Sequence, residues 1–307
     1  MNKLVRRVIG CCLVFGAAVA FADYDIDQPM TVARLNGIDI AYTTVGEPDA
    51  PPVLMIMGLT ASHRLWGDDI VNRLVDAGYR VILFDNRDTG DSAFLDELGE
   101  PVIWWQMLKN TLGFDMDSPY TLRDMAADGI AVLNQLDIEQ AHIVGASMGG
   151  MIAQVIATEY ADRTTTLVSI MSTTGAPHLP SAEDGAGEAL FDLGESEGDV
   201  AARLRELGIF PESMPRQLMA VLQAGDRSEA VKTIAVPTLV QHGADDPLLP
   251  PPHGEHTAQL IEGSKLIIYP GMGHNLPPEV LPQVVHDMVL HFAATETSAG
   301  VEQAAAP

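Results

Sequence analysis

The chain has 307 residues and a formal net charge of −25, because 42 acidic residues outnumber 17 lysines and arginines. A surface this acidic repels nucleic acid and anionic lipid, so we exclude nucleic acid as a partner. The length suits one large domain with its own hydrophobic core.

The N-terminus has the pattern of an export signal. A basic start precedes a short apolar stretch, and a cleavage site of the A-x-A type ends at Ala22. The stretch is too short for a membrane-spanning helix, so we predict no stable membrane insertion. We predict a signal peptide at residues 1–22 and a periplasmic or secreted mature chain from Asp23. Both cysteines, Cys11 and Cys12, would leave with the signal.

The next segments alternate between strand and helix patterns. In order they are a hairpin at 31–45 that turns at Asn36-Gly37, an apolar strand at 52–57, a helix at 66–77 and a strand at 80–84. The continuous apolar run of the second segment is typical of a central parallel strand that is buried on both faces. This alternation predicts an α/β fold in which helices flank a mostly parallel sheet.

Charged and polar residues after the strand at 80–84 have structural interpretations. We expect Arg87 to pair with Asp88 or Asp85 in an ion-pair network. The following helix begins at a capping box, in which Thr121 and Asp124 satisfy each other's backbone amides.

The most specific motif is Gly145-Ala146-Ser147-Met148-Gly149, which reads G-x-S-x-G. It follows an apolar strand and precedes a helix-compatible stretch, the context in which this pattern is a nucleophile elbow. The turn is so tight that the serine is strained and its neighbours must be small. We predict that Ser147 is a nucleophile, the alternative being an ordinary glycine-rich turn.

An oxyanion hole needs two backbone donors, one after the nucleophile and one from an earlier strand-to-helix loop. The amide of Met148 is the first. Gly58 breaks the apolar strand at 52–57, and the amide of Leu59 follows this permissive residue. We predict that Leu59 and Met148 form the hole. His63, in the same loop, is a candidate for contact with substrate in the pocket.

A nucleophilic serine needs a base, the base needs an orienting acid, and in this architecture both follow the serine in the chain. His274 ends an apolar strand and a glycine-rich loop, at the sheet edge where active sites collect. Asp245 and Asp246 follow another apolar strand. We choose Asp246, because Pro247 fixes the loop behind it, and we keep Asp245 as the alternative.

Two segments interrupt the sheet pattern. Residues 175–233 predict a small helical lid inserted after the sixth strand, above the serine. The excursion at 97–117 contains Trp104 and Trp105, which either line an apolar substrate pocket or only pack the excursion down. The predicted units are a core at 23–174, the lid at 175–233, the rest of the core at 234–292 and a disordered tail at 293–307, which is rich in Ala, Glu, Thr and Ser.

These motifs resemble the α/β-hydrolase superfamily and, within it, the aclacinomycin methylesterase-like esterases. The narrower resemblance covers Val32 to Phe292 and depends on the segments Asp85–Gly90, Pro119–Ala126, Ser147–Gln154 and Pro270–His274. It implies an α/β-hydrolase fold and a small-molecule ester substrate. Many relatives have histidine where this chain has Met57, and the lid and the excursion at 97–117 diverge, so the substrate of that group is not carried over.

We therefore expect an exported serine hydrolase that cleaves carboxylic esters through Ser147, His274 and Asp246 and an acyl-enzyme. The sequence has no H-E-x-x-H, cysteine cluster or phosphate loop, so no metal and no cofactor are expected. The same triad also serves lactonases, amidases and cofactor-free haloperoxidase-like perhydrolases. A non-catalytic ligand-binding protein of this fold is the remaining alternative, although such binders often lose members of the triad.

Overall fold

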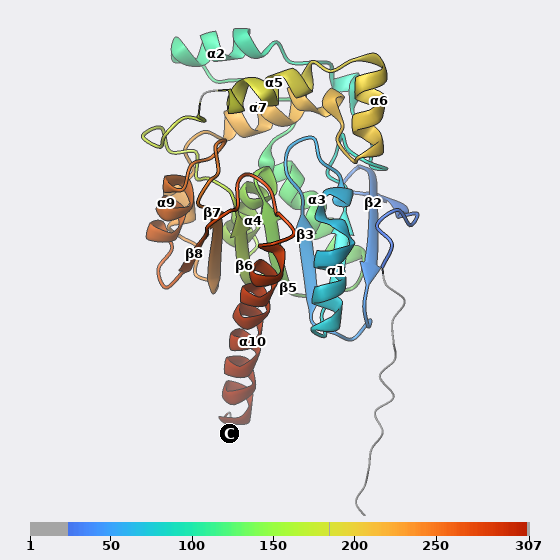
Figure 1. The fold of residues 1–307 in the computed structure, drawn as a ribbon, viewed down its shortest axis with the longest axis vertical. Helices are drawn as coiled ribbons and strands as arrows, with labels where there is room; N and C mark the ends of the chain where they lie inside the picture. The colour runs from blue at the N-terminus through green and yellow to red at the C-terminus, as the bar shows by residue number, and fades with distance from the viewer. Residues whose placement is uncertain (1–23, 184, 306–307) are drawn as a thin grey trace, which may run out of the picture.

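The computed structural model describes residues 24–183 and 185–305, so the predicted signal peptide at 1–22 and Asp23 lie outside the described residues. Eight strands form one sheet in the order β1-β2-β4-β3-β5-β6-β7-β8, which confirms the predicted α/β fold (Figure 1). The strands are β1 (Thr31–Leu35), β2 (Ile38–Val45), β3 (Pro52–Ile56), β4 (Arg80–Phe84), β5 (Ala141–Ala146), β6 (Thr164–Ile170), β7 (Thr238–Gly243) and β8 (Lys265–Tyr269).

The sheet is antiparallel at one edge and parallel elsewhere. β1 and β2 form the predicted hairpin, whose turn residues Asn36 and Gly37 both have positive φ, and β2 also pairs antiparallel with β4. From β4 through β8 every neighbouring pair is parallel. Since β3 lies between β4 and β5, the strand order reverses beside β3, and the loops after β3 and β5 meet at a topological switch point.

Helices cover both faces of the sheet, and the alternation of side chains along each strand fills two cores. On β3, Val53 and Met55 pack with α1 (Gly67–Asp76) and α10 (Leu281–Ala305). Leu54 and Ile56 point to the other face, where α3 (Leu122–Gln135) and α4 (Met148–Glu159) lie. All four strand side chains are fully buried, as expected of a central parallel strand.

The segment predicted to be the lid is helical in the structure. The lid, residues 175–233, contains α5 (Ala186–Gly194), α6 (Gly198–Glu206), α7 (Met214–Ala224) and α8 (Ser228–Val231). Together with α2 (Ile103–Thr111), helices α5, α6 and α7 lie across one end of the sheet, on the side of the carboxyl ends of the parallel strands (Figure 1). α9 (Pro252–Leu260) packs beside β7 and β8.

The C-terminal tail differs from its prediction. We expect disorder from Ala293 onward, whereas α10 continues through Ala305. Alanine, the strongest helix former, is the most frequent residue of this stretch, which favours continuation of the helix that packs on the core. Across residues 24–183 and 185–305, no helix is both long and apolar enough to span a bilayer.

The charged loop after β4 also differs from its prediction, because Arg87 pairs with neither Asp88 nor Asp85. Arg87 Nε and Nη2 donate to the carboxylate of Asp128 on α3, at 2.7 and 2.8 Å. Asp88 instead binds Arg216 of the lid. The backbone at Asp88 has a φ of 67°, so the chain turns there and neighbouring charged side chains diverge to different partners.

Candidate active site

Ser147 lies in a strained turn between β5 and α4. Its φ is 55° and its ψ is −121°, a conformation that non-glycine residues rarely adopt. A Cβ atom at Gly145 would overlap the carbonyl oxygen of Gly149, and one at Gly149 would overlap the carbonyl oxygen of Ile56. The two glycines of the motif therefore permit the close packing of strand, turn and helix that the elbow needs.

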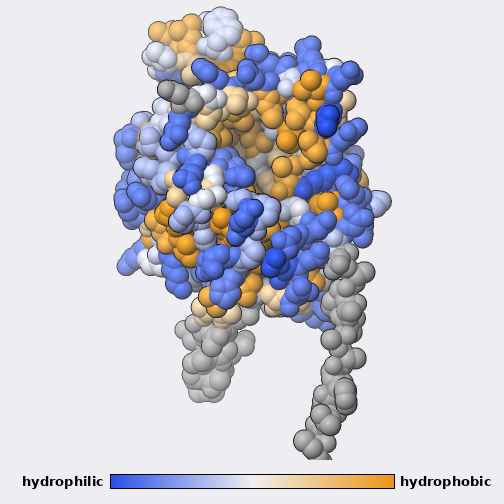
Figure 2. All heavy atoms as spheres, viewed as in Figure 1, coloured by the Kyte–Doolittle hydropathy of each residue, from blue (hydrophilic) through white to orange (hydrophobic). Residues whose placement is uncertain are grey.

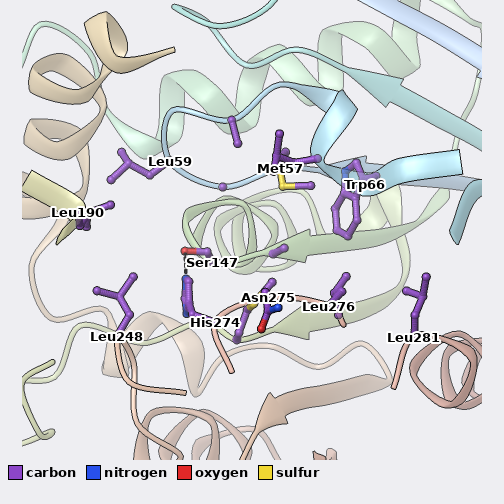
Figure 3. A pocket seen from close by; sticks show the side chains of 15 residues that line it. Met57, Leu59, Trp66, Ser147, Leu190, Leu248, His274, Asn275, Leu276 and Leu281 are labelled. Carbon is purple, nitrogen blue, oxygen red and sulfur yellow. Dashed lines mark hydrogen bonds between the residues drawn. The ribbon is translucent and has the colours of Figure 1, made fainter. Parts of the chain in front are cut away.

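The structure brings Ser147, His274 and Asp246 together, although they lie in three different loops. His274 Nε2 is 2.9 Å from Ser147 Oγ (Figure 3). On the other side of the ring, His274 Nδ1 is 2.8 Å from Asp246 Oδ2. One tautomer satisfies both bonds: Nδ1–H donates to the carboxylate, and Nε2 accepts the serine hydroxyl. In this state the imidazole is ready to take a proton from Ser147.

Asp246 is held as a buried carboxylate. Its side chain is fully buried, and Oδ1 accepts the amides of Leu248 and Leu249 at 3.0 and 2.9 Å. Burial opposes ionisation, but the hydrogen bond and charge of His274 and the amide of Leu249 outweigh it and hold the pKa of Asp246 below its usual value. The alternative acid, Asp245, is exposed and accepts the amide of Gly271 instead.

The loop after β3 lies directly against the nucleophile. A Cβ atom at Gly58 would be 3.1 Å from Ser147 Cβ. The backbone of the next residue, Leu59, therefore lies beside the nucleophile. Met148 is the first residue of α4, where backbone amides have no acceptor within the helix. The amides of Leu59 and Met148 thus come from the two loops that meet beside Ser147, as the sequence predicts for an oxyanion hole.

A cavity of about 370 Å³ opens at Ser147, within the range of small-molecule sites. Apart from the indole N–H of Trp66, the polar side-chain groups among its described lining residues are those of Ser147, His274 and Asn275. The full set is Met57, Gly58, Leu59, Ala61, Leu65, Trp66, Ala146, Ser147, Met171, Leu190, Leu248, His274, Asn275, Leu276 and Leu281. A hollow with apolar residues gathered in it is visible beneath the lid in Figure 2. The cavity therefore suits an uncharged, largely apolar molecule.

Ser147 lies between two apolar walls of this cavity (Figure 3). On one side are Leu59, Leu190 and Leu248, and on the other are Met57, Trp66, Leu276 and Leu281. Because Leu190 belongs to α5, the lid supplies part of the first wall. A molecule whose reacting atom sits at Ser147 would extend an apolar group toward each wall.

None of the three candidate pocket residues, His63, Trp104 and Trp105, lines this cavity. His63 is only 3% exposed, and its Nδ1 lies 2.8 Å from Asp85 Oδ1, so its ring faces the loop after β4. Trp104 and Trp105 lie on the outer helix α2 and are 68% and 49% exposed, in contact with each other. Leu190, Leu248 and Trp66 line the cavity instead, and as ordinary apolar residues they give no signal in the sequence.

No group of three or more His, Cys, Asp or Glu side chains that could hold a metal ion occurs in the described part of the chain. The polar groups at the site include the side chains of Ser147, His274, Asn275 and the buried Asp246, together with the two loop amides.

Comparison with known proteins agrees with this architecture. A family model described as alpha/beta hydrolase fold matches residues 51–197. The chain is 28% identical to the rhodomycin D methylesterase DnrP of Streptomyces peucetius, over 81% of this chain and 93% of that protein. It is 29% identical to BpoC of Mycobacterium tuberculosis, a candidate non-heme bromoperoxidase, over 84% of this chain and 98% of that protein.

Among solved structures, the esterase RhEst1 from Rhodococcus sp. has a similar fold, with a TM-score of 0.66 and 21% identity, over 87% of this chain and all of that one. The sheet, the elbow and the family match together show that the chain has the α/β-hydrolase fold. Two rhodomycin D methylesterases of Streptomyces are thus among the proteins that this chain resembles over most of its length.

Proposed function

We propose that the protein is a serine hydrolase that cleaves an apolar carboxylic ester through an acyl-enzyme. The observation that carries this proposal is the continuous hydrogen-bonded chain from Asp246 through His274 to Ser147, which ends in an apolar cavity. A neutral imidazole that accepts the serine hydroxyl and donates to a buried carboxylate is the arrangement that activates serine.

In the proposed reaction Ser147 Oγ attacks the ester carbonyl while its proton moves to His274 Nε2. The resulting imidazolium is stabilised by the ionised Asp246, whose lowered pKa keeps it charged at neutral pH. The amides of Leu59 and Met148 donate to the developing oxyanion. His274 then protonates the departing alcohol, and a water molecule, deprotonated by His274, releases the acid from Ser147.

The cavity walls favour an uncharged ester with apolar groups on both sides of the carbonyl. The acyl and alcohol parts would lie against the two walls, one containing Leu190 and the other containing Trp66. Among the described residues that line these walls, His274 in its protonated form is the only charged one. The relation to rhodomycin D methylesterases supports an ester with a small alcohol. We therefore propose that the larger acyl part lies against one wall and the smaller alcohol part lies against the other.

A series of nitrophenyl esters from acetate to decanoate tests this function on the mature chain. We expect hydrolysis that rises with acyl length until the cavity of about 370 Å³ is filled and then falls. The matched control is Ser147→Ala, which keeps the fold and removes the nucleophile. Hydrolysis that persists in this variant would show that another group carries the reaction.

A second candidate is suggested by the similarity to BpoC. Hydrogen peroxide in place of water would attack the acyl group on Ser147 and release a peracid, with the serine restored. We expect ester hydrolysis to dominate in water. The test supplies the enzyme with an ester and hydrogen peroxide together and compares the rates at which acid and peracid form. Faster formation of peracid than of acid would favour this second candidate.

We also propose that the protein is exported, as the basic start, the apolar stretch and the site ending at Ala22 suggest. Mass spectrometry of the protein from its natural host would then find a chain that begins at Asp23 outside the cytoplasm. A cytoplasmic protein with an intact N-terminus would contradict export.

A further inference from the structure

The loop beside Ser147 is hydrogen-bonded to the lid. We call residues 58–62 the oxyanion loop. The amide of Phe210 donates to the carbonyl of Thr60 at 2.8 Å, and the amide of Ser62 donates to the carbonyl of Gly208 at 2.9 Å. Ala61 and Ile209 form an antiparallel bridge between them. The lid therefore pairs with this loop like a very short strand.

A side chain of the lid completes this connection. Gln217, on α7, is fully buried, and its Oε1 accepts the amide of Thr60 at 2.7 Å. Its Nε2 donates to the carbonyl of Arg87 at 2.9 Å. Because an amide donor and a carbonyl acceptor face the two ends of this side chain, only one orientation of its amide satisfies both. Gln217 thus joins the oxyanion loop to the loop after β4.

The oxyanion loop needs such support because its backbone is strained. Thr60 has a φ of 62°, which is costly for a β-branched residue and persists only where the surroundings hold it. Both polar backbone groups of Thr60 are bound by lid residues, its amide by Gln217 and its carbonyl by Phe210. Without Gln217 the buried amide of Thr60 would lose its partner, which favours relaxation of the loop.

Relaxation of the loop would reach the oxyanion donor through the next peptide. The carbonyl of Gly58 accepts the amide of Ala61 at 3.3 Å, a turn that spans Thr60. In a trans peptide the carbonyl and the following N–H point in opposite directions, so this turn also sets the direction of the Leu59 amide. A change at Thr60 therefore alters where Leu59 donates.

We infer that Gln217 is a positioning residue for the oxyanion hole: the lid uses it to hold Thr60 and thereby to aim the Leu59 amide. The inference depends on the proposed ester hydrolysis, because it assigns a further residue to that reaction. Through Thr60, Gln217 acts on the Leu59 amide, whose hydrogen bond to the substrate oxygen becomes stronger in the transition state. Its loss is therefore expected to lower kcat and to leave KM nearly unchanged.

Two substitutions distinguish the effect of the Oε1 acceptor of Gln217 from the effect of the size of its side chain. Gln217→Met keeps the length and loses both hydrogen bonds, and we expect kcat to fall about 10- to 100-fold with KM within about threefold. Gln217→Glu keeps an acceptor for Thr60, so its kcat should recover to within about tenfold of the wild type. Equal kcat in the two variants would contradict the role of Oε1.

The matched control is Gln241→Met, which removes another fully buried glutamine that binds Tyr269 and the carbonyl of Val284. We expect it to lower Tm as Gln217→Met does and to leave kcat near the wild-type value. A similar fall of kcat in both variants would indicate a general effect of stability and would overturn the positioning role.

Hydrogen exchange supplies a readout that does not depend on turnover. In Gln217→Met the amides of residues 58–62 should exchange faster, while those of β5 and α4 keep their protection. Unchanged exchange in this loop would overturn the inference. If the wild type hydrolyses esters through Ser147 and Gln217→Met has the same kcat, the positioning role of Gln217 is overturned while the proposed function stands. A wild type without such hydrolysis would overturn the proposed function as well.

Discussion

Replacing Ser147 or His274 with alanine is expected to lower kcat for ester hydrolysis by about 10⁵- to 10⁶-fold. Without His274 the serine keeps its proton, and without Ser147 no acyl-enzyme forms. Since the two groups act in one step through their 2.9 Å contact, the double variant should be no slower than either single variant. Steady-state kinetics on one nitrophenyl ester measures all three variants.

Controls for this prediction are available among similar residues. His286, on the exposed side of α10, should tolerate alanine with no change in kcat. Asp246→Asn should lower kcat by about 10⁴-fold, because the amide selects the wrong tautomer of His274. Asp245→Asn should cost far less, since the Asp245 carboxylate accepts the amide of Gly271 and not a proton of His274. Losses that multiply in the Ser147 and His274 double variant would contradict a shared step.

Replacing Arg216 with leucine is expected to destabilise the fold by about 3 to 5 kcal/mol, the usual cost of leaving a buried charge without its partner. Arg216 is 1% exposed, and its Nε and Nη2 donate to the carboxylate of Asp88 at 2.9 and 3.0 Å. Asp88 is fully buried and otherwise accepts the hydroxyl of Tyr120 and the amide of Leu95. The lid helix α7 is therefore joined to the core through an ion pair out of contact with water.

Unfolding by urea at neutral pH measures this cost, and two further variants identify its source. Removing both charges in Arg216→Leu with Asp88→Leu should restore part of the lost stability, because no unpaired carboxylate remains. Arg123→Leu breaks an exposed pair with Glu159 and should change the free energy of unfolding by at most about 1 kcal/mol. A loss in Arg216→Leu as small as in Arg123→Leu would contradict the buried pair's role.

Features that depend on near neighbours in the chain could be predicted from the sequence. The capping box is present, with the amide of Asp124 donating to Thr121 Oγ1 and the amide of Thr121 donating to Asp124 Oδ2. The positive φ of Ser147 follows from the glycines around it. The prediction of His274 and Asp246 also required the expected order of strands in the sheet, because that order brings these two residues close to Ser147.

Features that depend on distant packing could not be predicted. Asp88 and Arg216 lie 128 positions apart, so the sequence offered Arg87 as a nearer but wrong partner for Asp88. His63 follows the right strand for a pocket residue, yet a buried carboxylate, Asp85, turns its ring away from the cavity. The exposure of Trp104 depends on where α2 is placed in the fold, which no local pattern determines.

The central claim is that Ser147 carries the acyl group, and mass spectrometry after reaction with a fluorophosphonate tests it most directly. The reagent loses fluoride as the serine oxygen bonds to phosphorus, and the adduct mimics the tetrahedral intermediate. We predict one adduct on the peptide that contains Ser147, none in Ser147→Ala and slow formation in His274→Ala. An ester-hydrolysing protein that stays unlabelled, or is labelled at another residue, would contradict the claim.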